Sequence, residues 1–228
     1  LDLQALALAM LHFVRGEEAT VRSFLSERLR KLGVLDGRVR NRWTMALGYV
    51  ADTYRGAGNF SRAIVTYRKA LEILPDDARI ELNLAQAYAG AGEMLQAIES
   101  YKRSIQLDPN QTLAYVNLGI AHAAEGNFQS AIAMYESALA RNPYEPLAYF
   151  NLANIYLERQ QPQRAIELYQ KAVSLDPSLS LGYYHLARSY ILTRDYAKAL
   201  DAVNRSLEFD PSRESARQMR RDLERMVQ

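Results

Sequence analysis

Apolar side chains recur along this chain at helical spacing, in paired stripes separated by short polar breaks. In one pair, Tyr149, Leu152 and Tyr156 lie three and four residues apart, and after a break Ala165 and Tyr169 continue the pattern. Residues at these intervals share one face of an α-helix. The pattern therefore predicts two helices joined by a turn, whose remaining apolar face must be covered by a neighbouring pair.

The paired stripes repeat every 34 residues through five successive units. Self-similarity at a fixed period of this length is typical of repeat proteins. Each unit closes with a proline, which ends the second helix, and a small residue in the first helix lets the second helix approach closely. The prolines are Pro75, Pro109, Pro143, Pro177 and Pro211, the small residues are Ala51, Ala85, Gly119, Ala153 and Ala187, and the second helices carry Ala63, Ala97, Ala131, Ala165 and Ala199.

The turn between the two helices carries Gly58, Gly92 or Gly126 in the first three units. Glycine suits a helix C-terminus at which the chain takes a positive φ. Gln160 and Arg194 hold the same register in the last two units. We expect both residues to adopt this turn at a cost of up to ~1 kcal/mol each.

These residues resemble the tetratricopeptide repeat (TPR) family. Its pattern combines an aromatic residue, Leu, a small residue and Tyr in the first helix with Ala, an aromatic residue, Ala and Pro afterwards. The resemblance covers residues 44–213, and it implies an all-α fold, a right-handed TPR superhelix (α-solenoid) of helix-turn-helix repeats with helical caps. The five repeats are expected at residues 44–77, 78–111, 112–145, 146–179 and 180–213.

Both ends of the chain are expected to cap the array. Residues 1–43 are predicted to form a helical hairpin broken near Gly16, followed by a polar connector over residues 33–42. Residues 214–228 are predicted to form a C-terminal capping helix, because apolar residues recur there at helical spacing among arginines. The chain begins without Met, so an anchor, a signal or an enzyme domain upstream is kept as an alternative.

Composition narrows the class of protein. The chain has 28 basic and 26 acidic side chains, a net charge of +2, no cysteine and three histidines. This charge disfavours nucleic-acid binding, and no apolar run has the ~18–20 residues of a membrane span. Arginine outnumbers lysine 23 to 5, which favours a GC-rich genome, and we expect a bacterial source. We expect a cytoplasmic protein or one peripheral to a membrane, with membrane association through an upstream segment as an alternative.

The sequence carries no recognisable catalytic constellation. It has no nucleophile elbow, no phosphate-binding glycine loop and no paired-histidine metal motif. Eleven of the fifteen tyrosines hold packing positions of the repeat, which explains their abundance. We therefore expect no catalytic residue, no metal site, no cofactor and no enzymatic activity.

The resemblance implies that the first helices line a concave groove, into which their second, fifth, sixth, ninth and twelfth positions point. The sixth positions include Asn83, Asn117 and Asn151, whose amides can bond to an extended peptide backbone. The competing interpretation is that these asparagines tether neighbouring turns. We expect the remaining contacts from Asn154, Leu82, Val116, Ile120, Phe150, Tyr184 and Arg188, with Leu113, Leu147 and Leu181 at the second positions.

These groove residues predict a protein partner that presents apolar side chains, as an extended peptide or an amphipathic helix. The carboxylate clamp of chaperone-binding TPR domains is disfavoured, because Leu82, Val116 and Phe150 stand where basic residues would be needed. The function expected is a non-enzymatic scaffold or adaptor that assists the assembly of a complex. Self-association, a membrane-associated assembly factor (bacterial or thylakoid type) and a regulatory segment of a larger enzyme are the alternatives.

Overall fold

The structure is a computed structural model that describes residues 37–227, and it is helical throughout, with only short turns between helices. The predicted N-terminal hairpin lies outside the described residues. Two compact units are distinguished, which meet in the chain between Pro109 and Asn110. The described helices of the N-terminal unit are α3 (Gly37–Gly56), α4 (Phe60–Ile73), α5 (Ala78–Gly90) and α6 (Met94–Leu107).

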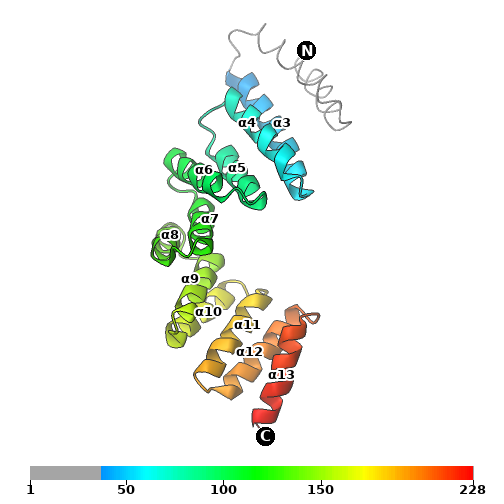
Figure 1. Cartoon of the computed structure of the whole chain (residues 1–228), viewed down its shortest axis with the longest axis vertical. Helices are drawn as coiled ribbons and strands as arrows, with labels where there is room; N and C mark the ends of the chain where they lie inside the picture. Colours follow the sequence, from blue (N-terminus) through cyan, green and yellow to red (C-terminus); the bar gives the residue numbers. More distant parts are fainter. Residues whose placement is uncertain (1–36, 228) are drawn as a thin grey trace. The chain divides into compact units, whose positions relative to one another are not determined.

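The C-terminal unit contains three hairpins and a closing helix (Figure 1). The first helices of its repeats begin at Thr112, Pro146 and Ser180, where the 34-residue register places the start of each unit. Its helices are α7 (Thr112–Ala124), α8 (Phe128–Arg141), α9 (Pro146–Glu158), α10 (Pro162–Leu175), α11 (Ser180–Leu192), α12 (Tyr196–Phe209) and α13 (Glu214–Val227).

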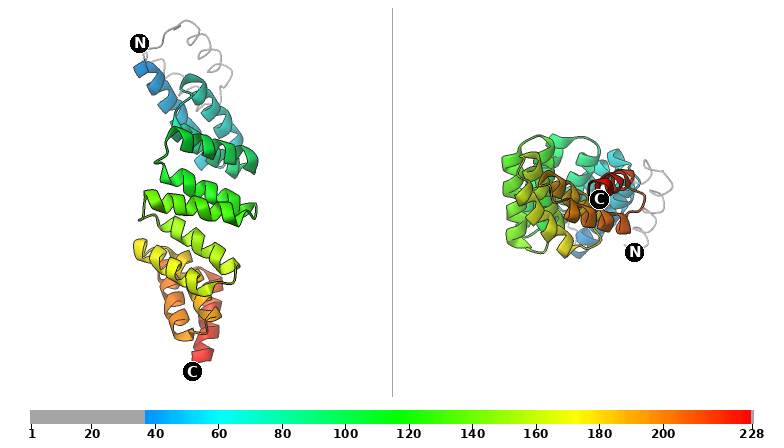
Figure 2. Two further views of the ribbon diagram at one scale, coloured as in Figure 1. Left: turned by 90° about the vertical axis from the view of Figure 1, so that its left-hand side faces the viewer. Right: turned by 90° about the horizontal axis from the view of Figure 1, so that it is seen from below.

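Within each unit, helices adjacent in sequence pack against each other (Figure 2). The two helices of every hairpin are in contact, and the second helix of one hairpin packs on the first helix of the next within the same unit. In the C-terminal unit, α13 packs on α12 and so covers the last hairpin. The predicted all-α solenoid of helix-turn-helix repeats is therefore confirmed.

The connector predicted before the first repeat is partly wrong. Helix α3 begins at Gly37, well inside the segment 33–42 that was expected to be a polar connector. The added turns contain Arg38, Arg40 and Arg42 and no proline, and arginine is a good helix former even without an apolar stripe. Because these residues add no apolar stripe, the pattern of apolar positions does not predict that the helix extends over them.

The turn inside each repeat ends the first helix in the same way in all five units. The residue at the turn has a positive φ, of 74°, 80° and 76° at the three glycines, 57° at Gln160 and 61° at Arg194. The next N–H then reaches back to the carbonyl five residues earlier, as in Asn59 to Tyr54 at 2.8 Å and Gln161 to Tyr156 at 2.9 Å. This is the Schellman motif, and it confirms the turn predicted for Gln160 and Arg194.

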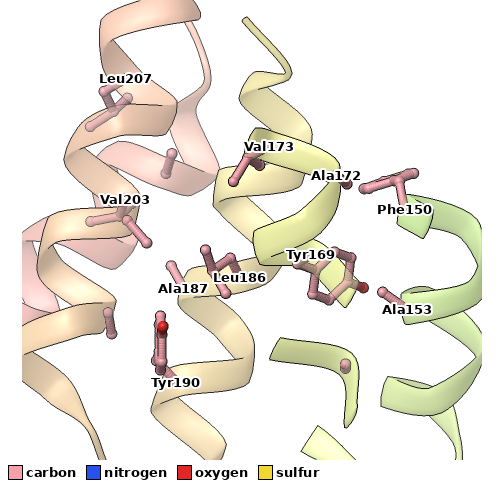
Figure 3. Packing of buried hydrophobic residues seen from close by; sticks show 14 of the residues in the cluster. Phe150, Ala153, Tyr169, Ala172, Val173, Leu186, Ala187, Tyr190, Val203 and Leu207 are labelled. Carbon is pink, nitrogen blue, oxygen red and sulfur yellow. The ribbon is translucent and has the colours of Figure 1, made fainter. Parts of the chain in front are cut away.

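The core of each unit is built from the alanines and aromatic residues of the repeat. In the N-terminal unit, Tyr67 is fully buried among Leu47, Ile64, Ile80 and Leu84. In the C-terminal unit, Tyr169 holds the same register and lies between α10 and α9 (Figure 3). Alanines on the facing helices leave room for these rings, and burying a large apolar side chain contributes about 1.5–3 kcal/mol. The labelled cluster in Figure 3 comprises Phe150, Ala153, Tyr169, Ala172, Val173, Leu186, Ala187, Tyr190, Val203 and Leu207.

Candidate functional site

The first helices of the C-terminal unit form one continuous surface, because α7 contacts α9 and α9 contacts α11. We call the side chains that α7, α9 and α11 present to solvent at their second, sixth and ninth positions the first-helix face. Positions two and nine are seven residues apart, which places them on the same side of a helix. Leu113, Ile120 and Leu147 occupy three of these positions and are 41%, 44% and 41% exposed.

Three apolar residues expected to contact a partner do not lie on this surface. Leu82, Val116 and Phe150 hold the fifth positions of their helices and are only 5%, 0% and 8% exposed. They are buried in the packing of their own unit, so the expectation that they supply contact area is corrected. On the first-helix face, exposed apolar area comes instead from Leu113 and Leu147 at the second position and from Ile120 at the ninth.

The predicted asparagine ladder is divided between the two units. Asn83 belongs to the N-terminal unit, whereas Asn117 and Asn151 lie partly buried on α7 and α9 of the C-terminal unit. The Nδ2 group of Asn151 donates to the Leu147 carbonyl of its own helix at 2.8 Å. Because Nδ2 carries two protons, a second N–H and the Oδ1 atom of this amide can still serve a ligand.

Asn83 is engaged in a polar network inside the N-terminal unit. Its Nδ2 donates to Oδ1 of Asp52 at 3.0 Å. The same Asp52 oxygen accepts from the Tyr67 hydroxyl and lies 3.4 Å from Nη2 of Arg55. Burial and this carboxylate raise the pKa of Tyr67, so its hydroxyl stays a donor. Asn83 therefore links α5 to α3. At this position the asparagine acts as a tether between helices, which was the alternative to binding a ligand backbone.

An aromatic cluster replaces this network in the C-terminal unit. The Tyr169 hydroxyl donates to Oδ1 of Asn154 at 2.6 Å, and in Figure 3 it points toward α9. The His185 ring stacks on Tyr169 with 5.9 Å between centroids and meets Phe150 edge-on at 5.6 Å. Asn154, expected to hold a ligand backbone, therefore has a structural partner within its own repeat.

The His185 ring is neutral at physiological pH. Burial, with Arg188 and Arg213 nearby, lowers its pKa to about 4. Its Nδ1 atom is buried and has no hydrogen-bond partner among the described residues. The positive charge at this end of the face therefore belongs to the two arginines.

Tyr184 and Arg188, the two expected groove residues of α11, lie close to this cluster. The Tyr184 ring meets His185 edge-on with centroids 5.5 Å apart, and the guanidinium carbon of Arg213 lies 5.9 Å from its centroid. Arg213 also forms an ion pair with Asp210 at 3.0 Å. The side chain of Arg188 is exposed.

The structure thus brings together Asn117, Ile120, Asn151, Asn154, Tyr184 and Arg188 in one unit, and places Asn83 in the other.

Asp52, Tyr67, Tyr169 and His185 were not predicted as site residues. Their positions in the repeat could have identified them. Asp52 holds the ninth position of its first helix and His185 the sixth, and Tyr67 and Tyr169 hold one and the same position of the second helix. The described helices contain no group of three or more His, Cys, Asp or Glu side chains that could hold a metal ion. None of the helices in residues 37–227 is both long and apolar enough to cross a bilayer.

The sequence matches four models of the tetratricopeptide repeat family, over residues 51–92, 76–143, 116–180 and 156–223. The chain belongs to the tetratricopeptide repeat family. No curated protein matches it.

Several solved structures resemble the chain. MamA is 29% identical, with a TM-score of 0.62, over 73% of this chain and 97% of that one. PilF of Pseudomonas aeruginosa is 21% identical, with a TM-score of 0.76, over 82% and 86% of the two chains. YrrB, described as a TPR protein with an unusual peptide-binding site, is 16% identical, with a TM-score of 0.60, over 78% and 92%. The last two likenesses concern the fold alone.

Proposed function

We propose that this chain is a non-enzymatic scaffold that binds a segment of a partner protein on the first-helix face of its C-terminal unit. The bound segment is an extended peptide or an amphipathic helix with apolar side chains, and binding assists the assembly of a larger complex. The observation that carries the proposal is the row of exposed Leu113, Ile120 and Leu147 on α7 and α9, with amides beside it. Asn83 is left out, because its amide is bonded to Asp52.

The apolar side chains on this face supply binding energy. A 41–44% exposed aliphatic side chain contributes on the order of 1–2 kcal/mol when a partner covers it, at about 25 cal/mol per Å². Three such side chains contribute about 3–6 kcal/mol, which leaves little or no surplus over the cost of association, about 4–15 kcal/mol. The ligand must therefore extend along several first helices rather than fill one pocket.

The amides on the same face supply orientation. Asn117 and Asn151 hold equivalent positions one repeat apart, so their spacing is set by the packing of α7 on α9. A side-chain amide can pair with both the N–H and the C=O of a peptide backbone, whatever the peptide sequence. The peptide-binding site of YrrB, a protein of similar fold, supports such a role for an array of TPR repeats.

The test is affinity capture from extracts, comparing wild type with a triple variant Leu113→Ser/Ile120→Ser/Leu147→Ser. All three side chains are exposed, so the variant is expected to fold, which circular dichroism checks. Leu95→Ser is the matched control, because Leu95 is 72% exposed on α6 of the other unit. The proposal predicts a partner that is retained by wild type and by Leu95→Ser and lost by the triple variant. Equal retention by all three proteins would contradict it.

A further inference from the structure

The ninth positions of the first-helix face change in chemical character along the C-terminal unit. Ile120 on α7 is apolar, Asn154 on α9 is an amide, and Arg188 on α11 is a cation. The second positions of the same helices are leucine throughout, at Leu113, Leu147 and Leu181. A ligand that lies across the three helices therefore meets a row of leucines, exposed at Leu113 and Leu147 and partly buried at Leu181, and a second row that becomes positive at α11.

Arg188 differs from most arginines around it. Arg205 pairs with Glu208 at 2.9 Å, Arg213 with Asp210 at 3.0 Å and Arg217 with Glu214 at 3.3 Å. Arg188 is exposed and forms no ion pair with any residue between 37 and 227. Its guanidinium keeps five N–H donors in a fork that fits a carboxylate in two-point contact.

The surroundings of Arg188 favour an anion over a second cation. Its field and that of Arg213 both act on the partly buried His185 ring. Arg213 pairs with Asp210 at 3.0 Å, and its guanidinium carbon lies 5.9 Å from the centroid of the Tyr184 ring. The charge of Glu158 acts on Tyr169, but Glu158 forms no ion pair with Arg188 within the described part of the chain.

We propose that the partner segment carries an aspartate or glutamate next to its apolar side chains, and that Arg188 receives this carboxylate beside Tyr184 and Arg213. This inference rests on the proposed function and names the chemistry of its ligand. The acidic side chain lies over α11, and the apolar side chains lie over α7 and α9. The charge therefore fixes the direction in which the ligand crosses the face, which the apolar row alone does not do.

The test is selection of peptides from a random dodecapeptide display library on the full chain, followed by affinity measurement on synthetic copies of the selected peptides. We expect peptides with two or more apolar residues and one acidic residue at a constant spacing from them. Replacing that acidic residue by its amide weakens binding about fivefold, which is typical of a partly exposed ion pair. Raising NaCl from about 0.05 to 0.5 M weakens the binding of the acidic peptide more than the binding of its amide variant.

Two charge variants assign the effect to one side chain. Arg188→Gln abolishes the preference for the acidic peptide over its amide and keeps the affinity for the amide unchanged. Arg188→Glu reverses the preference. Lys171→Gln is the matched control, because Lys171 is an exposed cation on α10, a second helix, and its loss leaves the preference intact.

The outcomes separate this inference from the proposed function. Apolar peptides without an acidic preference, or a preference that survives Arg188→Gln, overturn the role of Arg188 and leave the first-helix face as the binding surface. A library that yields no peptide sensitive to Leu113→Ser/Ile120→Ser/Leu147→Ser overturns both.

Discussion

In each unit, side chains at the same three positions of the repeat join one repeat to the next. The residue types at these positions, and so the contacts they make, differ between the two units. In the N-terminal unit, Asp52 accepts hydrogen bonds from the hydroxyl of Tyr67 and the amide of Asn83. In the C-terminal unit, Asn154 accepts from Tyr169, and His185 stacks on the tyrosine ring instead of bonding to the acceptor. One junction is polar and the other is aromatic.

This difference shows which parts of a repeat junction are fixed and which can vary. The buried tyrosine is common to both junctions, at 0% exposure for Tyr67 and Tyr169. The groups around its hydroxyl vary. We therefore expect pH and substitution to change the free energy of unfolding differently in the two units. An asparagine in the ladder register can therefore tether a neighbouring helix, as Asn83 does, or bond within its own helix, as Asn151 does.

The largest expected effect is the pH dependence of the aromatic junction. The pKa of His185 is about 4 in the folded chain against 6.5 ordinarily. Between these values the unfolded chain binds a proton that the folded chain does not, so the free energy of unfolding falls as pH drops from 6.5 toward 4. We expect a loss of about 2 kcal/mol across this window, after allowance for partial exposure.

His185→Asn isolates this contribution, because asparagine holds the same register in the three preceding repeats. The variant loses the ring stacking, so it starts less stable than wild type near neutral pH. The free energies of unfolding of the two proteins should converge as the pH falls toward 4, measured by urea titration with circular dichroism. Parallel curves across the window would show that His185 is not the titrating group.

The next effect concerns the acceptor of the polar junction. Asp52→Ala removes the acceptor of both Tyr67 and Asn83, and we expect it to lower the free energy of unfolding by about 2 kcal/mol. Asn154→Ala removes the acceptor of Tyr169 alone, and we expect about 1 kcal/mol. Trp43, the single tryptophan, is buried in α3 and reports the N-terminal unit by its fluorescence. Hydrogen exchange of the amides in α9 and α10 measures the stability of the C-terminal unit.

Asp52→Asn sharpens this comparison, because it gives the polar junction the acceptor found at Asn154. We expect it to retain about half of the stability that Asp52→Ala loses. Asp201→Ala, at an exposed position of α12, is the control and should leave both units unchanged. Equal losses for Asp52→Ala and Asn154→Ala would remove the distinction between the junctions.

A smaller effect is expected when the tyrosine hydroxyls are deleted. Tyr67→Phe and Tyr169→Phe should each cost about 1 kcal/mol, because each removes one hydrogen bond from a partly buried acceptor. Tyr135→Phe serves as the internal control, since the Tyr135 hydroxyl bonds to no other described residue although its ring is 1% exposed. Thermal unfolding of the three variants measures the difference. A Tyr135→Phe loss as large as the others would mean that the hydroxyl bonds are not the cause.

Substitutions in the turns of the repeats are also expected to change stability, and the smallest effect is expected at Gln160. Gln160→Gly should raise the free energy of unfolding by about 0.5 kcal/mol, because Gln160 has a φ of 57°. Gly92→Ala should lower it by about 1 kcal/mol for the same reason. Gly56→Ala, with open space at its Cβ and no positive φ, is the control and should be neutral or stabilising. Destabilisation by Gln160→Gly would contradict the strain assigned to the turn.

Most of the fold follows from the sequence, because the 34-residue repeat predicts where the helices and turns of residues 44–213 lie. The strained turns at Gln160 and Arg194 could be predicted from that register alone. The start of α3 at Gly37 could not, since Arg38, Arg40 and Arg42 extend a helix without adding to an apolar stripe.

The site was predicted less completely. Spacing identifies the side of a helix on which a residue lies, but it does not show how far a neighbouring helix covers that side. Val116 and Phe150 were therefore expected at the surface, whereas packing within the repeat buries them. The bond from Asn83 to Asp52 joins residues 31 positions apart and depends on how α5 packs on α3, which no local pattern encodes.

We propose that the first-helix face of the C-terminal unit receives the partner. The most direct test places the photoreactive residue p-benzoylphenylalanine at position 120 in one protein and at position 95 in another, and irradiates both in extract. We expect a covalent adduct with a second polypeptide from position 120 on α7 and none from position 95 on α6. An adduct formed from position 95 and not from position 120 would contradict it.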